Sequence, residues 1–234
     1  KDKLPELKNI GLVTASTWID YDGDSWEDLV IVGEWMPIRF FKNNQGTFKE
    51  DTKQVFKSDQ NGWWFSIEKG DFDNDGDQDL VVGNLGTNYK YQASVEKPFS
   101  IYLNDFDKNE VKDIVLSYST GSEEYPVRGR QCSSEQMPAI MKKFKNYDAF
   151  ASASLKDIYT DQMLDNSLKY EIKSFKSIYL ENNDGKFIAK PLPMEAQYSN
   201  INAFVVKDFD SDGNLDLVIG GNLYNAEVET PRND

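Results

Sequence analysis

The stretch DFDNDGDQDLVVGN, residues 71–84, places five aspartates within nine positions and continues into an apolar run that predicts a buried strand. Two carboxylates about 4 Å apart repel each other by roughly 4 kcal/mol at an effective dielectric near 20, so a turn that gathers several of them needs a cation. The pattern returns as DYDGDSWEDLVIVG at 20–33, DFDKNEVKDIVLSY at 105–118 and DFDSDGNLDLVIGG at 208–221. Four acidic turns with one spacing therefore organise this chain.

Oxygen-bearing side chains recur at the first, third, fifth and ninth positions of each turn. Such alternate oxygens can converge on one cation, together with the backbone carbonyl at the seventh position. Hard oxygen ligands in this number favour Ca²⁺, and Mg²⁺ ranks second because it takes fewer protein ligands in stricter octahedral geometry. The predicted ligands are Asp20, Asp22, Asp24, Trp26 and Asp28; Asp71, Asp73, Asp75, Asp77 and Asp79; Asp105, Asp107, Asn109, Val111 and Asp113; and Asp208, Asp210, Asp212, Asn214 and Asp216.

These turns are named loops 1 to 4, at 20–28, 71–79, 105–113 and 208–216. Glycine at the sixth position permits a sharp turn in loops 2 and 4, whereas loops 1 and 3 carry Ser25 and Glu110 there. An EF-hand needs a bidentate glutamate at the twelfth position and a helix after it. Here that position is apolar and lies in a run rich in β-branched residues, which predicts strand, metal loop, strand and excludes an EF-hand.

Composition narrows the classes of function. The chain has 234 residues and a formal charge of −14, which argues against nucleic acid or an anionic membrane surface as partner. No apolar run approaches the length of a membrane-spanning helix, so no membrane insertion is expected. The beginning, KDKLPELKNI, has no apolar region of a signal peptide, as is also true of a mature or excised chain. The single cysteine excludes an internal disulfide, and the absence of histidine removes the commonest general base.

The repeat D-x-D-x-D-G-x-x-D-L, followed by apolar residues and glycine, resembles the FG-GAP/VCBS repeat, the calcium-binding blade unit of integrin α-chain-type β-propellers. The phrases GNLGTNYKY, YPVRGRQCSSEQMP, SIYLENNDGKF and GNLYNAEVETPRND are similar to bacterial FG-GAP/VCBS proteins related to cartilage acidic protein, the ASPIC/UnbV group. This resemblance covers essentially the whole chain. It implies an all-β propeller whose blades have four antiparallel strands, with the metal loop between the first two.

The loop spacing suggests about four blades in a single propeller domain or propeller segment over residues 1–234. PIRFFKNNQGTFKE (37–50) predicts the outer two strands of the first blade, and a similar phrase recurs as SIYLENNDGKFIAK (177–190). The interval between loops 2 and 3 is short for a blade. Either the second blade has reduced outer strands, or FSIYLNDF (99–106) serves as an outer strand and also leads into loop 3.

The interval between loops 3 and 4 is too long for one blade, and its surplus predicts a helical insertion at about 133–160. Ser133 and Gln136 have the spacing of a capping box, apolar residues follow at helical spacing, and a second helical piece is expected at 150–159. The phrase GNLYNAEVETPRND ends the sequence where a fourth blade begins its third strand. We therefore expect a fragment of a larger propeller, or an unusual closure.

The function that these features predict is a calcium-stabilised, extracytoplasmic binding or scaffold module of the adhesion or carbohydrate-recognition kind. Extracellular calcium modules work at about 10⁻⁴–10⁻³ M calcium, which favours a secreted, periplasmic or cell-surface location. The expected partner is a protein or carbohydrate ligand, and the chain is expected to be a monomer or part of a larger chain.

The alternative is a carbohydrate-active enzyme such as a calcium-dependent polysaccharide lyase or hydrolase. The five tryptophans either pack between sheets or stack on sugar rings. Arg128 and Arg130 line a solvated edge, form a salt bridge with a neighbouring acid, or clamp an anionic ligand. No catalytic or cofactor-binding residue is predicted.

Overall fold

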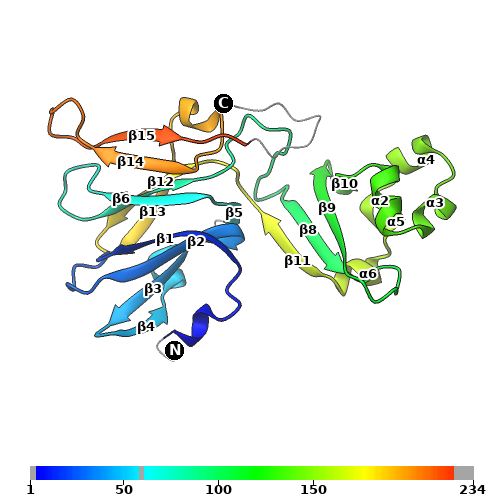
Figure 1. Cartoon of the computed structure of the whole chain (residues 1–234), viewed down its shortest axis with the longest axis horizontal. Helices are drawn as coiled ribbons and strands as arrows, with labels where there is room; N and C mark the ends of the chain where they lie inside the picture. The colour runs from blue at the N-terminus through cyan, green and yellow to red at the C-terminus, as the bar shows by residue number, and fades with distance from the viewer. Residues whose placement is uncertain (1–3, 58–60, 224–234) are drawn as a thin grey trace. The chain divides into compact units, whose positions relative to one another are not determined.

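The computed structural model of the chain describes residues 4–57 and 61–223 (Figure 1). The chain forms two compact units, each described by itself below. Unit 1 comprises Lys1–Lys90 and Phe175–Asp234, and unit 2 comprises Tyr91–Ser174. Unit 2 is therefore inserted, in sequence, between two segments of unit 1. Among the described helices, none is both long and apolar enough to cross a membrane.

The described residues of unit 1 form three antiparallel sheets. Sheet A has the order β1-β2-β3-β4, with β5 paired to β2; sheet B has the order β6-β7-β12-β13; sheet D pairs β14 with β15. Its short helices are η1 (Pro5–Leu7), α1 (Thr52–Val55) and η2 (Met194–Gln197). The strands are β1 (Leu12–Ile19), β2 (Asp28–Pro37), β3 (Arg39–Asn44), β4 (Thr47–Glu50), β5 (Asn61–Trp63), β6 (Ser66–Gly70), β7 (Asp79–Gly83), β12 (Ile178–Asn183), β13 (Lys186–Pro191), β14 (Ala203–Lys207) and β15 (Asp216–Gly220).

In β2 and β7, the apolar run after the loop is buried on both faces of the strand. In β2, Val30 and Val32 face a core shared with sheet B, while Leu29 and Ile31 face a second core closed by the N-terminal segment. Because side chains alternate across a strand, only a continuous apolar run can fill both cores. The first strands of the sheets lie together, since β1 and β14 both contact β6 (Figure 1).

A buried asparagine fastens the outer hairpin of each large sheet. Asn43 is the second-last residue of β3, and its amide donates to the Glu27 carbonyl at 2.8 Å. Asn182 is its counterpart in β12, and its amide donates to the carbonyls of Tyr21 and Gln78 at 2.9 and 3.1 Å. The Asn182 contact with Tyr21 links sheet B to loop 1 of sheet A.

We expect Asn182→Ala to lower the free energy of unfolding of unit 1 by about 2–3 kcal/mol, because buried partners of its amide lose their hydrogen bonds. The neighbouring residue Asn183 is exposed, so Asn183→Ala is a matched control expected to change the stability by less than about 0.5 kcal/mol. Urea unfolding followed by tryptophan fluorescence measures both. Equal effects of the two substitutions would contradict the clamp role of Asn182.

Unit 2 has one sheet, sheet C, of order β10-β9-β8-β11, and five short helices between β10 and β11. Tyr102 and Val115 of the sheet pack against Met137, Ile140 and other apolar side chains of the helical segment. The strands are β8 (Phe99–Asn104), β9 (Asp113–Thr120), β10 (Glu123–Pro126) and β11 (Leu168–Ile172). The helices are α2 (Arg130–Gln136), α3 (Ala139–Lys143), α4 (Tyr147–Ala151), α5 (Leu155–Ile158) and α6 (Asp161–Asp165).

The structure corrects both assignments of the short interval between loops 2 and 3. FSIYLNDF contains β8, which belongs to sheet C, so it is not an outer strand of sheet B. Sheet B is complete, because SIYLENNDGKFIAK supplies its outer strands as β12 and β13. In the sequence, all of unit 2 therefore lies between β7 and β12, which pair directly with each other.

The helical segment also differs from the sequence-based prediction. It runs from Arg130 to Asp165, beyond the expected 133–160. Ser133 caps no helix: it lies inside α2, which ends before Pro138 because proline has no N–H to continue the helix. The capping box is instead at Ser154 and Asp157 of α5. Most of the final phrase GNLYNAEVETPRND, residues 224–234, lies outside the described residues.

Candidate metal-binding loops

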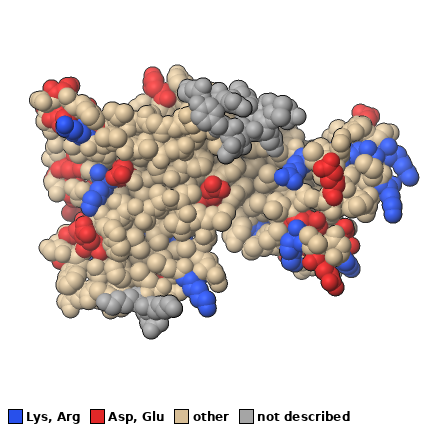
Figure 2. Space-filling view, viewed as in Figure 1, with Lys and Arg blue, Asp and Glu red and all other residues tan. Residues whose placement is uncertain are grey.

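In each sheet, the acidic loop joins the two strands that come first in chain order. Loop 1 joins β1 to β2, loop 2 joins β6 to β7, loop 3 joins β8 to β9, and loop 4 joins β14 to β15. Loops 2 and 4 are neighbours, since the Asn74 amide donates to Asn214 Oδ1 at 2.7 Å. Acidic side chains gather along this edge of unit 1 (Figure 2). The predicted arrangement of strand, acidic loop and strand is thus present four times among the described residues.

All four loops share a left-handed backbone at the sixth position. Its φ is 99° at Gly76 and 91° at Gly213, and Ser25 and Glu110 adopt 69° and 70° without the freedom of glycine. A left-handed conformation costs an ordinary residue about 1–2 kcal/mol, so the loops keep this shape against a local penalty. The turn therefore does not depend on glycine, and loops 1 and 3 match loops 2 and 4.

The carboxylates at positions one, three and nine converge in every loop. In each group the three candidate ligand oxygens lie within 4.8 Å of one another. This spacing lets one cation touch all three. The groups are Asp20, Asp22 and Asp28; Asp71, Asp73 and Asp79; Asp105, Asp107 and Asp113; and Asp208, Asp210 and Asp216.

The first carboxylate also shapes the loop around itself. In loop 3, Asp105 accepts hydrogen bonds from the backbone N–H groups of Asn109 and Glu110, both at 2.9 Å. Asp20 accepts the equivalent bonds in loop 1 at 3.1 and 2.8 Å. These bonds place the carboxylate at the centre of the turn.

The structure does not bring the fifth-position residues into these groups. Each fifth-position oxygen accepts instead from the backbone N–H of the seventh residue, at 2.8 to 3.1 Å. The seventh residues were predicted to contribute only a backbone carbonyl. The pairs are Asp24 with Trp26, Asp75 with Asp77, Asn109 with Val111, and Asp212 with Asn214.

The ninth-position carboxylate connects the loop to the rest of its sheet. Asp28 and Asp79 are fully buried, and their Oδ1 atoms accept the backbone N–H of Asn43 at 2.7 Å and of Asn182 at 2.8 Å. Asp79 Oδ2 also accepts from the Tyr179 hydroxyl at 2.7 Å. Sequence reasoning missed these outer-strand partners, although the repeated phrases NNQG and NNDG were the available signal.

Three loop carboxylate oxygens are buried and accept no hydrogen bond from any described residue: Oδ1 of Asp71, Asp77 and Asp107. A buried charged oxygen without a partner is costly, and a cation supplies that partner. Burial, followed by the effect of Asp75, raises the pKa of Asp77 to about 6. The residues present therefore fit a hard divalent cation such as Ca²⁺.

Protons would compete with a cation at these loops. Burial raises the pKa of Asp28 to about 6, although hydrogen bonds from the backbone of Asn43 and Tyr21 oppose the rise. Below about pH 4, near the ordinary pKa of aspartate, this group stabilises the metal-free fold, and the contribution is lost as the pH rises through 6. We therefore expect the stabilisation by calcium to grow from about pH 4 to pH 7. Urea unfolding with calcium and with EDTA across this range measures it, and a constant difference would contradict it.

A lysine side chain lies next to the carboxylates of loop 1. Lys42, on β3, pairs with Asp22, and its Nζ lies 3.2 Å from Asp24 Oδ2. The hydrogen bond to Asp22 is the main cause that raises the pKa of Lys42, so the ammonium stays charged. The equivalent residue before the buried asparagine of sheet B is Glu181, which pairs with Lys190 instead. Loop 2 therefore has no such competitor from its outer strand.

We expect Lys42→Met to raise the cation affinity of loop 1 by about tenfold, because the ion no longer displaces an ammonium group. Trp26 is the only tryptophan within the four loops, so terbium luminescence excited through tryptophan reports chiefly on loop 1. Lys49, opposite Lys42 on β4, is exposed and offers the matched control Lys49→Met. Equal terbium affinities for the two variants would show that Lys42 does not compete.

Comparison with known families supports this geometry. Residues 20–82 match the family model described as FG-GAP-like repeat. The matched segment runs from loop 1 to β7 and so contains loops 1 and 2. A search of curated proteins gave no match. The chain is thus similar to the FG-GAP-like repeat family over residues 20–82, and loops 3 and 4 repeat the same loop geometry.

Proposed function

We propose that this chain is a calcium-stabilised segment of a β-propeller that acts as a binding or scaffold module outside the cytoplasm. The observation that carries the proposal is the recurrence of one acidic loop at the same place in four sheets, with three converging carboxylates each time. The FG-GAP-like match over residues 20–82 supports it. The finer relationship to the ASPIC/UnbV group rests on the resemblance of phrases alone.

The packing of unit 1 supports a propeller arrangement. Neighbouring sheets share apolar cores, one between sheets A and B and another between sheets B and D. First strands that lie side by side, as β1, β6 and β14 do, are what blades present around a propeller axis. On one face of sheet D the opposed residues Val205 and Val218 are exposed, as on a face of the kind that a further blade covers.

The role proposed for calcium is structural. All the acidic ligands of a site come from one nine-residue loop, and each loop closes the turn between two paired strands. When bound, the ion neutralises the carboxylates and fixes the turn. Extracellular calcium modules work at about 10⁻⁴–10⁻³ M, which is the reason for placing the protein outside the cytoplasm. The proposed partner is a protein or carbohydrate ligand.

Isothermal titration of EDTA-treated, desalted protein with calcium tests the proposal. We expect about four ions per chain, with magnesium binding more weakly. The variant D71N/D73N keeps the shape of loop 2 but removes two of its charges, so we expect it to bind one ion fewer. No heat of binding, together with no metal in elemental analysis, would mean that the loops are only polar turns.

A further inference from the structure

A small pocket in unit 2 carries an unusual set of side chains. It lies between the end of β10 and helix α4, and it has a volume of about 270 Å³. Two arginines and three tyrosines line it above an apolar floor that includes Phe150, and no carboxylate lines it. Ligand pockets commonly have about 300–1,000 Å³, so this one has room for a single sugar ring. The polar residues are Tyr118, Tyr125, Arg128, Arg130 and Tyr147, named here the arginine–tyrosine pocket.

The positive charge at the pocket is locally uncompensated. The whole chain has a formal charge of −14, yet residues 126–151 contain five lysines and arginines and only two acidic residues, Glu135 and Asp148. Basic side chains gather over the helices of unit 2 (Figure 2). Arg128 is exposed, and no described carboxylate forms an ion pair with Arg128 or Arg130. An arginine without a carboxylate partner is available for an anionic ligand.

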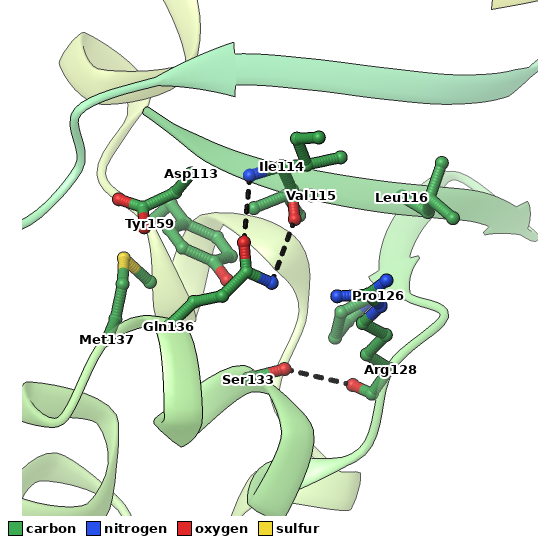
Figure 3. A pocket seen from close by; sticks show the side chains of 10 residues that line it. All are labelled: Asp113, Ile114, Val115, Leu116, Pro126, Arg128, Ser133, Gln136, Met137 and Tyr159. Carbon is green, nitrogen blue, oxygen red and sulfur yellow. Dashed lines mark hydrogen bonds between the residues drawn. The ribbon is translucent and has the colours of Figure 1, made fainter. Parts of the chain in front are cut away.

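The backbone that presents these arginines is fixed by α2. The Ser133 hydroxyl donates to the Arg128 carbonyl at 3.2 Å (Figure 3). Gln136 binds both backbone groups of Ile114 on β9, at 3.0 and 3.4 Å, and so fastens α2 to the sheet (Figure 3). The hollow between these residues has only about 10 Å³, enough for one water at most. These hydrogen bonds therefore hold the backbone of Arg128 in place.

Arg130 is positioned from the other side. Its Nε donates to the Phe144 carbonyl at 2.7 Å, and its guanidinium lies 5.2 Å from the centre of the Tyr147 ring. The bond uses Nε and leaves the terminal nitrogens for a ligand. Such a preformed arrangement lowers the entropic cost of binding.

The tyrosines offer aromatic faces that the fold does not need. Tyr147 is 63% exposed and Tyr118 is 42% exposed, and Tyr118 lies 6.2 Å from Tyr125, centre to centre. Burial in a core accounts for neither exposed ring. Amphipathic rings of this kind combine an apolar face with a hydroxyl donor, which suits the C–H face and hydroxyl groups of a sugar.

We propose that the arginine–tyrosine pocket binds a sugar residue that carries a carboxylate, a hexuronate, at the end of a chain or in a short oligosaccharide. Arg128 receives the carboxylate, Arg130 supports it, and Tyr147 stacks on the ring. A long polyanion such as a nucleic acid is repelled by the net charge of −14, whereas one charged residue interacts mainly with the local arginines. This inference rests on the proposed binding role, but not on the calcium sites.

Chemical-shift mapping of the isotope-labelled full chain tests the proposal, with calcium present throughout. The probes are the methyl glycosides of glucuronic and galacturonic acid, with the methyl glycosides of glucose and galactose as neutral controls. We expect saturable shifts at the amides of Gly129 and Arg130 with at least one uronide, at millimolar concentrations, and not with the neutral sugars. Inorganic sulfate is a further control: if it binds as tightly as the uronides, the site takes any oxyanion and the proposal fails.

Variants locate the binding. Arg128→Gln is expected to weaken uronide binding about tenfold or more, because it removes a charge-assisted hydrogen bond. Lys142→Gln makes the same change of charge at an exposed residue outside the pocket and is expected to change affinity by less than about twofold. Tyr147→Ala, at an exposed ring, is expected to weaken binding without altering the spectrum elsewhere. Absence of any uronide shift in protein that binds calcium normally would overturn this inference and leave the calcium proposal standing.

Discussion

Replacing Asp79 with alanine is expected to lower the free energy of unfolding of unit 1 by about 3–5 kcal/mol, even in EDTA. This buried carboxylate accepts from the backbone of Phe72 at 3.1 Å, the backbone of Asn182 at 2.8 Å and the Tyr179 hydroxyl at 2.7 Å. Alanine leaves these three donors without an acceptor, and each buried unsatisfied group costs about 1–3 kcal/mol. All five tryptophans belong to unit 1, so urea unfolding followed by tryptophan fluorescence reports on this unit.

Asp73→Ala is the matched control within the same loop. Asp73 belongs to the same group of converging carboxylates but is exposed. Partial desolvation, followed by the charges of Asp79 and Asp75, raises its pKa, which means that its charge is unfavourable in the metal-free fold. We therefore expect Asp73→Ala to be neutral or slightly stabilising in EDTA, and destabilising only in calcium. If the two variants lost equal stability in EDTA, the sheet-anchoring role of Asp79 would be wrong.

Removal of calcium is expected to have the second large effect. A site at tenfold excess of ion over its dissociation constant adds about 1.4 kcal/mol of stability. Loops 1, 2 and 4 belong to unit 1, so together they contribute about 4 kcal/mol there. For a unit of this size, that corresponds to a fall of roughly 10 °C in the melting temperature on addition of EDTA. Thermal unfolding with tryptophan fluorescence measures the fall.

Loop 3 provides the control for that experiment. The variant D105N/D107N changes only unit 2, so it should lose one bound ion but keep the full calcium-dependent shift of the tryptophan signal. Magnesium at the same concentration should restore less stability than calcium, because Mg²⁺ requires a strict octahedral arrangement of ligands, whereas Ca²⁺ tolerates a less regular one. A melting temperature that ignores both ions would contradict a structural role for the loops.

The local parts of this molecule could be predicted from its sequence. The aspartate spacing and the apolar run after it are local patterns of about fifteen residues. They predicted the strand, loop, strand unit and the convergence of the carboxylates at positions one, three and nine. The ligand role of the fifth-position oxygens stays a prediction, because an asparagine or aspartate can also bond the backbone two residues on, as Asp24 does with Trp26. Nothing in the spacing distinguishes these two uses.

The long-range parts could not be predicted. The pairing of β7 with β12 joins Val82 to Ile178 across the whole of unit 2, and no local pattern specifies such a contact. The recurrence of NNQG as NNDG was the one sequence signal for this pairing. Each phrase belongs to a strand with a buried asparagine, and that strand pairs with the strand that follows an acidic loop. The predicted capping role of Ser133 was wrong for a different reason. Helix α2 begins at Arg130 and ends before Pro138, so Ser133 lies inside it.

The pairing of β11 with β8 has a consequence for how unit 1 folds. Ile172 lies opposite Phe99, so the two ends of the inserted segment are held together by its own sheet. Closing a disordered ring of about ninety residues costs roughly 1.3 kcal/mol more than closing a ring of about twenty, which is what residues 84–98 and 173–177 leave once the ends are joined. Once unit 2 has formed, its joined ends make the connection behave as a short one. We therefore expect unit 2 to form before β7 pairs with β12, because its folded sheet shortens the chain that this pairing has to close.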